Sequence, residues 1–184
     1  MLWVFSGAMG TFRLVSSRVM YRNRWMTLRE ERVLRPDGAP GCFGVLDLVA
    51  GSSVLAREPD GSVWLVREHK YALGRVSLEA VSGALEPGEA PLDAARRELA
   101  EELGFTAERW EAMGHIDAFT NTVRSPNHLF FAEGLCPGVP CPEPGEEPVA
   151  VKLPLDAALA ALHRGEVTHS ATVALLLHAA LRER

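Results

Sequence analysis

Cysteine is scarce in this 184-residue chain, and its three cysteines are an odd number. Because the N-terminus also lacks a secretory signal pattern, we expect Cys42, Cys136 and Cys141 to be reduced thiols in a cytoplasmic protein. Cys136 and Cys141 stand in the segment CPGVPC, with no histidine or further cysteine at the spacing of a zinc site. The sequence therefore argues against structural zinc.

Long hydrophobic runs and internal repeats are also missing. No stretch approaches the roughly 20 apolar residues that cross a bilayer, so we expect no membrane-spanning segment. The apolar opening MLWVFSGAMG is short and lacks a basic start, and we interpret residues 1–10 as a flexible lead. The remaining length predicts one compact domain with an appendage.

The chain has no overall excess of basic charge, since its net charge is −5. Residues 1–35 nevertheless hold seven arginines against Glu30 and Glu31, which gives +5 there and −10 in the remainder. A basic N-terminal arm could bind phosphate, pair with the acidic body of a second subunit, or simply decorate a strand surface. The acidic body argues against a nucleic-acid partner, because such binding needs a basic surface.

Hydrophobic periodicity and turn residues predict a mixed α+β chain. We expect turns at Pro36-Asp37-Gly38 and Asp60-Gly61. The expected strands are two or three within 11–35, a long one over 43–55, and further ones over 62–68, 128–135 and 149–153. Residues 110–118 read as strand-like or irregular and 120–127 as a polar loop. Helices are expected over about 91–103, from Asp156, and over about 170–182.

The stretch from Gly83 to Phe105, GALEPGEAPLDAARRELAEELGF, organises the chain. Pro91 suits the first turn of a helix and Gly104 its end. Apolar residues recur at three- and four-residue steps and form one face: Leu92, Ala95, Leu99 and Leu103. Glu98, Glu101 and Glu102 fall at i, i+3 and i+4, so their carboxylates gather on another face. The alternatives are a solvated acidic face with Arg97 paired to Glu101, or a site for a hard divalent cation such as Mg²⁺.

This stretch resembles the Nudix box, G-x5-E-x7-R-E-U-x-E-E-x-G-U with U bulky and apolar, at every specified position. The resemblance implies a Nudix α/β/α sandwich over 41–184 and hydrolysis of a nucleoside diphosphate linked to another moiety, with Mg²⁺ or Mn²⁺. It implies metal binding by Glu98 and Glu102, assisted by Glu101 and the carbonyl of Ser82. It also implies a structural pair, Glu89 with Arg97, that braces the loop against the helix.

Features outside the box resemble the ADP-ribose pyrophosphatase branch of the family. That branch has an N-terminal strand domain, often exchanged across a homodimer, and residues 11–40 have its size and pattern. The segment Asn23-Arg24-Trp25 resembles its N-x-W element, so Arg24 and Trp25 are candidates to hold the base or ribose, with a core or interface role for Trp25 as the simpler reading. The E-L-P-A-G element reads Glu79-Ala80-Val81-Ser82-Gly83 here, which keeps Glu79 as a substrate-binding candidate.

Two positions depart from the ADP-ribose pattern. Lys70 replaces an arginine thirteen residues before the box glycine; a lysine contacts phosphate as a point charge rather than a bidentate fork. Thr120 replaces a proline about fifteen residues past the box. Near the last strand, the resemblance implies that Glu147, or Glu146, positions the attacking water; a solvated loop is the alternative.

We therefore expect a metal-dependent pyrophosphatase that converts ADP-ribose to AMP and ribose 5-phosphate, and a homodimer formed through the N-terminal strands. The alternatives are a hydrolase of GDP-mannose, FAD, NADH or a modified nucleoside triphosphate, and a non-catalytic Nudix module that senses a nucleotide. The N-terminal strand domain argues against the triphosphate enzyme, and the intact set of box carboxylates argues against the sensor.

Overall fold

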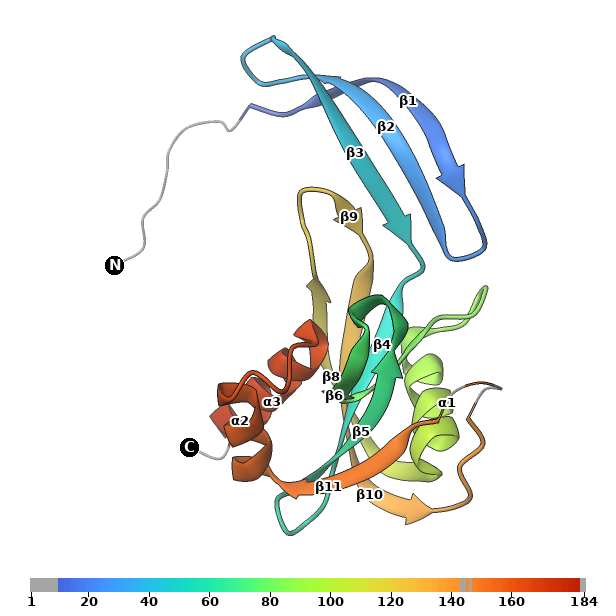
Figure 1. Cartoon of the computed structure of the whole chain (residues 1–184), viewed down its shortest axis with the longest axis vertical. Coiled ribbons are helices and arrows are strands. Elements are labelled where there is room, and N and C mark those ends of the chain that lie inside the picture. Colours follow the sequence, from blue (N-terminus) through green and yellow to red (C-terminus); the bar gives the residue numbers. More distant parts are fainter. Residues whose placement is uncertain (1–9, 143–144, 146, 183–184) are drawn as a thin grey trace. The chain divides into compact units, whose positions relative to one another are not determined.

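The computed structural model describes residues 10–142, 145 and 147–182. The chain divides into two compact units (Figure 1). In the described chain, the first unit holds residues 10–49 and 119–125, and the second holds the residues from 50 to 118 and from 126 to 182. The expected flexible lead lies outside the described residues, apart from Gly10.

The first unit is a sheet in the order β1-β2-β3-β9. Its strands are β1 (Arg13–Arg22), β2 (Met26–Leu34), β3 (Pro40–Leu48) and β9 (Val123–Arg124). The first three pair antiparallel, and β9 pairs parallel to β3. Asn23 closes the first hairpin, because its side-chain oxygen accepts hydrogen bonds from the backbone N–H groups of Trp25 and Met26. Gly38 closes the second with φ +80°, as the Pro-Asp-Gly turn predicted.

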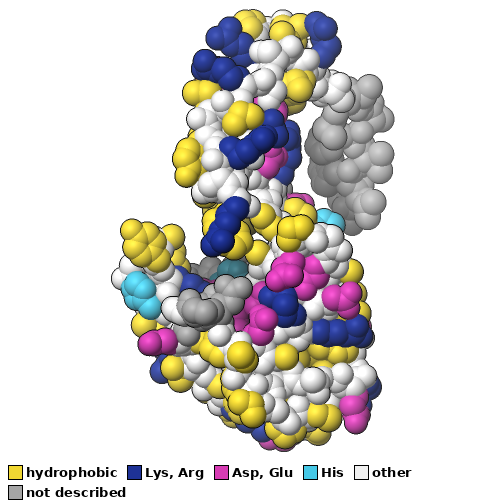
Figure 2. Space-filling model, turned by 90° about the vertical axis from the view of Figure 1, so that its right-hand side faces the viewer, with side chains coloured by type: hydrophobic (Ala, Val, Ile, Leu, Met, Phe, Trp, Pro, Cys, Tyr) yellow, Lys and Arg dark blue, Asp and Glu magenta, His cyan; other side chains and the backbone are white. Residues whose placement is uncertain are grey.

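This first sheet has little core of its own. Val33 and Val45 are buried, whereas every residue of β1 is exposed. The apolar side chains left exposed on β1 include Leu14, Val19 and Met20. Figure 2 shows hydrophobic and basic side chains side by side on this unit. A sheet with so much exposed apolar surface is typical of one that packs against a partner.

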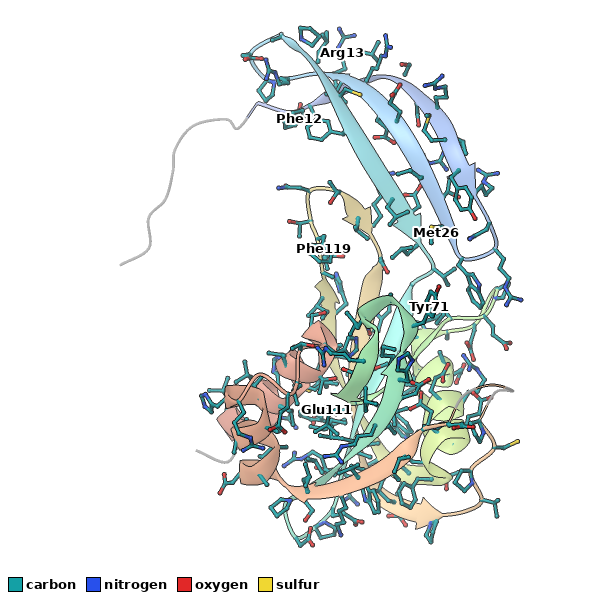
Figure 3. All side chains as sticks on the ribbon, viewed as in Figure 1. Phe12, Arg13, Met26, Tyr71, Glu111 and Phe119 are labelled. Atoms are coloured by element: carbon teal, nitrogen blue, oxygen red, sulfur yellow. The ribbon has the colours of Figure 1, made fainter. Side chains whose placement is uncertain are left out.

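The second unit is built on a sheet in the order β11-β5-β4-β10-β8, with β6 paired to β5 and β7 to β4. Its strands are β4 (Gly51–Arg57), β5 (Ser62–Lys70), β6 (Arg75–Glu79), β7 (Val81–Ala84), β8 (Phe105–Asp117), β10 (Pro126–Pro137) and β11 (Val149–Pro154). The pairing of β10 with β4 is parallel and the other pairings are antiparallel. A short 3₁₀ turn, η1 (Tyr71–Leu73), joins β5 to β6 and leaves Tyr71 94% exposed (Figure 3).

Helices cover both faces of this sheet, which confirms the α+β fold with an α/β/α arrangement (Figure 1). One apolar cluster includes Leu99 of α1 (Pro91–Leu103) with Val54 and Val66 of the sheet. The other joins Leu55 and Phe131 to α2 (Leu155–His163) and α3 (Ser170–Arg182), through residues such as Leu175. The sheet therefore stands between two cores, with α1 on one side.

Two sequence predictions of secondary structure were wrong. The expected single strand over 43–55 is two strands, because the backbone changes partner between consecutive residues. The N–H of Val49 donates to the carbonyl of Trp25, while the carbonyl of Ala50 accepts from Leu85. The expected polar loop over 120–127 contains β9 and the start of β10. Tertiary pairing gives these residues strand geometry despite their polar sequence.

Candidate active site

Helix α1 begins and ends where the sequence predicted. Pro91 occupies the first turn, where a missing N–H has no cost, and Asp93 lies near the positive end of the helix dipole. Gly104 adopts φ +67° and closes the helix with its N–H on the carbonyl of Ala100. A β-carbon at position 104 would lie 2.6 Å from the backbone nitrogen of Pro140. Both the positive φ and this lack of space therefore favour glycine there.

The acidic side chains of α1 are drawn inward rather than left in solvent. Glu98 and Glu102 are only 9% and 8% exposed, and Glu101 is half-buried. The Glu98 carboxylate crosses to β7, where it fills the space above Gly83: a β-carbon on Gly83 would lie 1.7 Å from Oε1 of Glu98. The reading of these carboxylates as a solvated helix face is therefore wrong for Glu98 and Glu102. Burying a charged carboxylate is costly unless a cation or hydrogen-bond donors compensate it.

Arg97 ties the acidic groups together. Its guanidinium binds both oxygens of Glu89, through Nε and Nη2 at 3.0 Å each. Nη1 reaches Glu98 at 2.7 Å and Glu101 at 3.1 Å, and Nη2 also donates to the carbonyl of Ala84 at 3.0 Å. The predicted pair between Glu89 and Arg97 is thus present, as the centre of a larger network. Figure 2 looks onto the α1 side of this unit and shows acidic side chains gathered around a basic one.

The network sets the protonation of its members. Hydrogen bonds from Arg97 hold the pKa of Glu89 below its ordinary value, against the opposing effect of burial. The backbone N–H of Glu86 adds a further donor to Glu89, at 2.9 Å. In turn, the hydrogen bonds to Glu89 raise the pKa of Arg97 despite partial burial. The loop before α1 is therefore fixed by a charged pair that stays ionised at neutral pH.

Ser82 lies on β7 with its side chain already engaged. Its hydroxyl lies 2.7 Å from the hydroxyl of Ser53 and donates to the carbonyl of Ala80 at 2.9 Å. Ser53 in turn donates to the side-chain oxygen of Asn127 at 3.0 Å. Any metal contact from Ser82 would consequently come from its main-chain carbonyl, as the resemblance implied.

Lys70 lies among carboxylates. Its ammonium forms a short ion pair with Glu68, two residues earlier on the same face of β5. Burial opposes the charge on Lys70, but the hydrogen bond to Glu68 and the nearby charges of Glu79 and Glu102 outweigh it. The pKa of Lys70 is therefore raised above its ordinary value. The structure thus brings the predicted phosphate contact, Lys70, into the electrostatic range of Glu102 of α1.

Glu79 is 7% exposed and meets a residue that sequence reasoning missed. Nδ1 of His169 lies 3.5 Å from the Glu79 carboxylate and 3.0 Å from the hydroxyl of Thr172. That hydroxyl accepts a hydrogen bond from the N–H of Ala80. Burial lowers the pKa of His169 more than Glu79 raises it, so this imidazole is neutral at pH 7. No local motif links residues 79 and 169, whereas Glu68 could have been found from its two-residue spacing to Lys70.

Glu147 lies in a hollow of about 540 Å³ on the second unit. Glu68 lines the same hollow, so this hollow borders the Lys70 ion pair. The side chain of Glu147 is exposed. The hollow is lined by Arg67, Glu68, His69, Val76, Gly145, Glu147 and Val149. Glu146, the other candidate for positioning water, lies outside the described residues.

Arg24 and Trp25 belong to the first unit, in the turn that Asn23 closes. The guanidinium of Arg24 stacks 4.3 Å from the Trp25 ring centroid, and Trp25 is 49% exposed. A half-exposed indole beside a cation is not a core residue. It presents an aromatic face that a nucleobase or a second subunit could cover.

The donor set suits a hard divalent cation. Glu98 and Glu102 provide buried carboxylates one helical turn apart, and that of Glu98 lies against Gly83 of β7. Among the described residues, no three acidic, histidine or cysteine side chains converge closely enough to hold a metal by themselves. Mg²⁺ usually takes one or two protein carboxylates and completes its shell with water and substrate phosphates. A pair of buried carboxylates therefore fits such an ion.

Comparison with known proteins agrees with this architecture. Residues 47–176 match the NUDIX domain and residues 12–46 match the nucleoside diphosphate sugar hydrolase N-terminal domain. The chain belongs to the Nudix family, and it is a Nudix hydrolase with the appended N-terminal domain of the nucleoside diphosphate sugar hydrolases.

Its relatives point to the same branch. An ADP-ribose pyrophosphatase of Mycobacterium tuberculosis is 27% identical over 91% of this chain and 84% of its own. An ADP-ribose pyrophosphatase of Bacillus subtilis is 29% identical over 67% of this chain and 66% of its own. A crystal structure of an ADP compounds hydrolase shares the fold, with a TM-score of 0.82, 21% identity and 94% coverage of both chains. None of the described helices is long and apolar enough to cross a bilayer.

Proposed function

We propose that this protein hydrolyses the diphosphate of a nucleoside diphosphate sugar, with ADP-ribose as substrate and AMP and ribose 5-phosphate as products. The observation that carries the proposal is the burial of Glu98 against Gly83, one helical turn from the buried Glu102, whose charge acts on Lys70. Buried carboxylates suit a divalent cation, whose charge would offset theirs, and a cationic side chain nearby suits a diphosphate.

Glu98 and Glu102, with Glu101 and the Ser82 carbonyl, would hold Mg²⁺ or Mn²⁺. When bound there, such a cation would offset the negative charge of the diphosphate and make water easier to deprotonate. Arg97 and Glu89 keep the carboxylates in place through the network described above. Lys70 would place a positive charge beside a phosphate oxygen of the substrate. The charge of Glu79 helps to keep the Lys70 ammonium protonated.

In the proposed reaction a water oxygen attacks one phosphorus of the diphosphate. The bond from that phosphorus to the bridging oxygen breaks, and the bridging oxygen leaves with the other phosphate. Glu147 accepts the proton of the attacking water. Its place in the hollow that Glu68 borders supports this assignment. Arg24 and Trp25 would hold the base or ribose by stacking.

We also propose a homodimer formed through the first sheet, in the cytoplasm. The exposed apolar side chains of β1 support the dimer, because a strand with every residue exposed gains little stability as a monomer.

The test is a panel of ADP-ribose, GDP-mannose, NADH, FAD and a modified nucleoside triphosphate, each incubated with protein and Mg²⁺ or Mn²⁺. We expect AMP chiefly from ADP-ribose, and no turnover after chelation with EDTA. Glu98→Gln should lower kcat roughly 100-fold or more while the thermal transition stays within a few degrees. Glu108→Gln, an exposed carboxylate on β8, is the matched control. Turnover by Glu98→Gln at the wild-type rate would refute the site; silence across the panel would favour a sensing module.

A further inference from the structure

A second hollow, of about 230 Å³, lies next to the one that holds Glu147. It is lined by Arg67, Arg75, Val76, Ser77, Leu78 and Glu166. The two hollows share Arg67 and Val76, so they meet along the strands β5 and β6. A ligand seated in the larger hollow could therefore extend past Arg67 into the smaller one.

Two guanidinium groups dominate the smaller hollow. Within the described part of the chain, no hydrogen bond or ion pair within 4 Å involves Arg67, although its charge acts on Glu166. Arg75 is anchored by Nη2 on the hydroxyl of Thr168, at 2.6 Å, and by Nη1 on the carbonyl of Val76, at 3.3 Å. These bonds orient the Arg75 guanidinium and leave further N–H donors unused. The oriented guanidinium of Arg75 and the guanidinium of Arg67, which has no hydrogen bond among the described residues, line one recess and suit a phosphate-type anion.

The remaining polar residues offset this charge only in part, since Arg67 acts on the Glu166 carboxylate by charge alone. Glu166 is the one acidic residue among those lining the hollow, and both its oxygens bind Arg164, at 2.6 and 3.2 Å. Ser77 contributes a buried hydroxyl with no hydrogen-bond partner among the described residues. The hollow therefore keeps a net positive charge and an unused hydroxyl at its wall.

We propose that this second hollow is a subsite for a phosphate group that the substrate carries in addition to its diphosphate. The proposal rests on the proposed function and extends its substrate class from ADP-ribose to nucleoside diphosphate derivatives that carry a further phosphate on a ribose. The diphosphate lies at the carboxylates of α1, and the extra phosphate binds Arg67 and Arg75.

The test compares matched pairs that differ by one phosphate: ADP-ribose 2′-phosphate against ADP-ribose, NADPH against NADH, and coenzyme A against its 3′-dephospho form. The measured quantity is the ratio of kcat/KM within a pair, with the same pairs also titrated calorimetrically. Two charge-assisted contacts to one phosphate predict a preference of about tenfold or more for the phosphorylated member of at least one pair.

Three variants locate the effect. Arg75→Ala should remove most of the preference, and Glu166→Gln should increase it, because the acidic side chain repels the incoming phosphate. General damage to the fold would not raise the kcat/KM ratio in one variant and lower it in the other, so opposite changes indicate a local effect. Arg109→Ala, which removes an arginine on β8 paired with Glu133, is the control of equal charge change and should leave the ratio unaltered.

The results that would overturn the subsite differ from those that would overturn the proposed function. Turnover without preference in any pair, or a preference that Arg75→Ala leaves intact, would overturn the subsite while the proposed function stands. If no pair is turned over, the proposed function fails, and calorimetry decides the subsite alone. Tighter binding of a phosphorylated member, lost in Arg75→Ala, supports it; equal binding of both members overturns it.

Discussion

The carboxylate of Glu98 stands where the side chain of residue 83 would be. A β-carbon on Gly83 would lie 1.7 Å from Oε1 and 2.0 Å from Cδ of Glu98, so the glycine of β7 makes room for the acid of α1. Gly83 and Glu98, which are fifteen residues apart in the sequence, thus meet because residue 83 lacks a side chain.

Gly83→Ala should fold but lose most of its activity. The atoms in the way are the flexible end of Glu98, so the carboxylate can move aside at little cost to the core, but it then leaves its position for the metal. We expect kcat/KM for ADP-ribose to fall roughly 10- to 100-fold, with near-native circular dichroism. Gly44→Ala is the control, because a β-carbon there meets no atom within 4 Å. Full activity in Gly83→Ala would show that the position of Glu98 is unimportant.

Glu89→Gln should lower the free energy of unfolding by about 1–3 kcal/mol at pH 7, because it removes one charge of a bidentate pair with Arg97. The pKa of Glu89 is depressed in the folded protein, so its stabilisation is present above the ordinary carboxyl value of 4.5 and is lost as pH falls through the folded value. The difference between wild type and variant should accordingly shrink below about pH 4.5. Urea unfolding at pH 7 and pH 3.5 measures this, and an equal difference at both pH values would contradict it.

Lys70→Met should reduce kcat/KM for ADP-ribose about 10- to 100-fold, since it removes a charged contact to phosphate. Lys70→Arg should recover most of this loss, because it restores the charge. The pKa of Lys70 is raised, so its charge persists and no loss of activity should come from Lys70 up to at least pH 10. Initial rates of both variants from pH 7 to 10 provide the measurement. If Lys70→Met matched wild type, the assigned phosphate contact would be wrong.

Val19→Glu should convert the proposed dimer into monomers. Val19 is 43% exposed on β1, and a charge there would be buried in an interface formed by this strand. Sedimentation equilibrium should give about twice the monomer mass for wild type and the monomer mass for the variant. Val139→Glu, at an 88% exposed valine of the second unit, is the control and should stay dimeric. A monomeric wild type would end the proposal of a dimer.

Local sequence was enough to predict the organising helix and most turns. Pro91, Gly104 and the three- and four-residue spacing of Leu99 and Leu103 predicted α1 with its observed bounds. The resemblance to the Nudix box predicted the pair of Glu89 with Arg97, and two hydrogen bonds join these side chains in the structure. These features depend on residues close together in the chain, whose local geometry limits the alternatives.

Only the tertiary structure decided how distant residues complete the site. It buried Glu98 against Gly83, placed His169 beside Glu79, and split the strand over 43–55 where the backbone changes partner. It also brought Arg67 and Arg75 to one hollow with Glu166, nearly a hundred residues later. The sequence by itself determined the types of chemical group and the helix that presents them. Packing of β6 and β7 against the rest of the second unit determined their neighbours, because contacts between residues far apart leave no periodic signal in the chain.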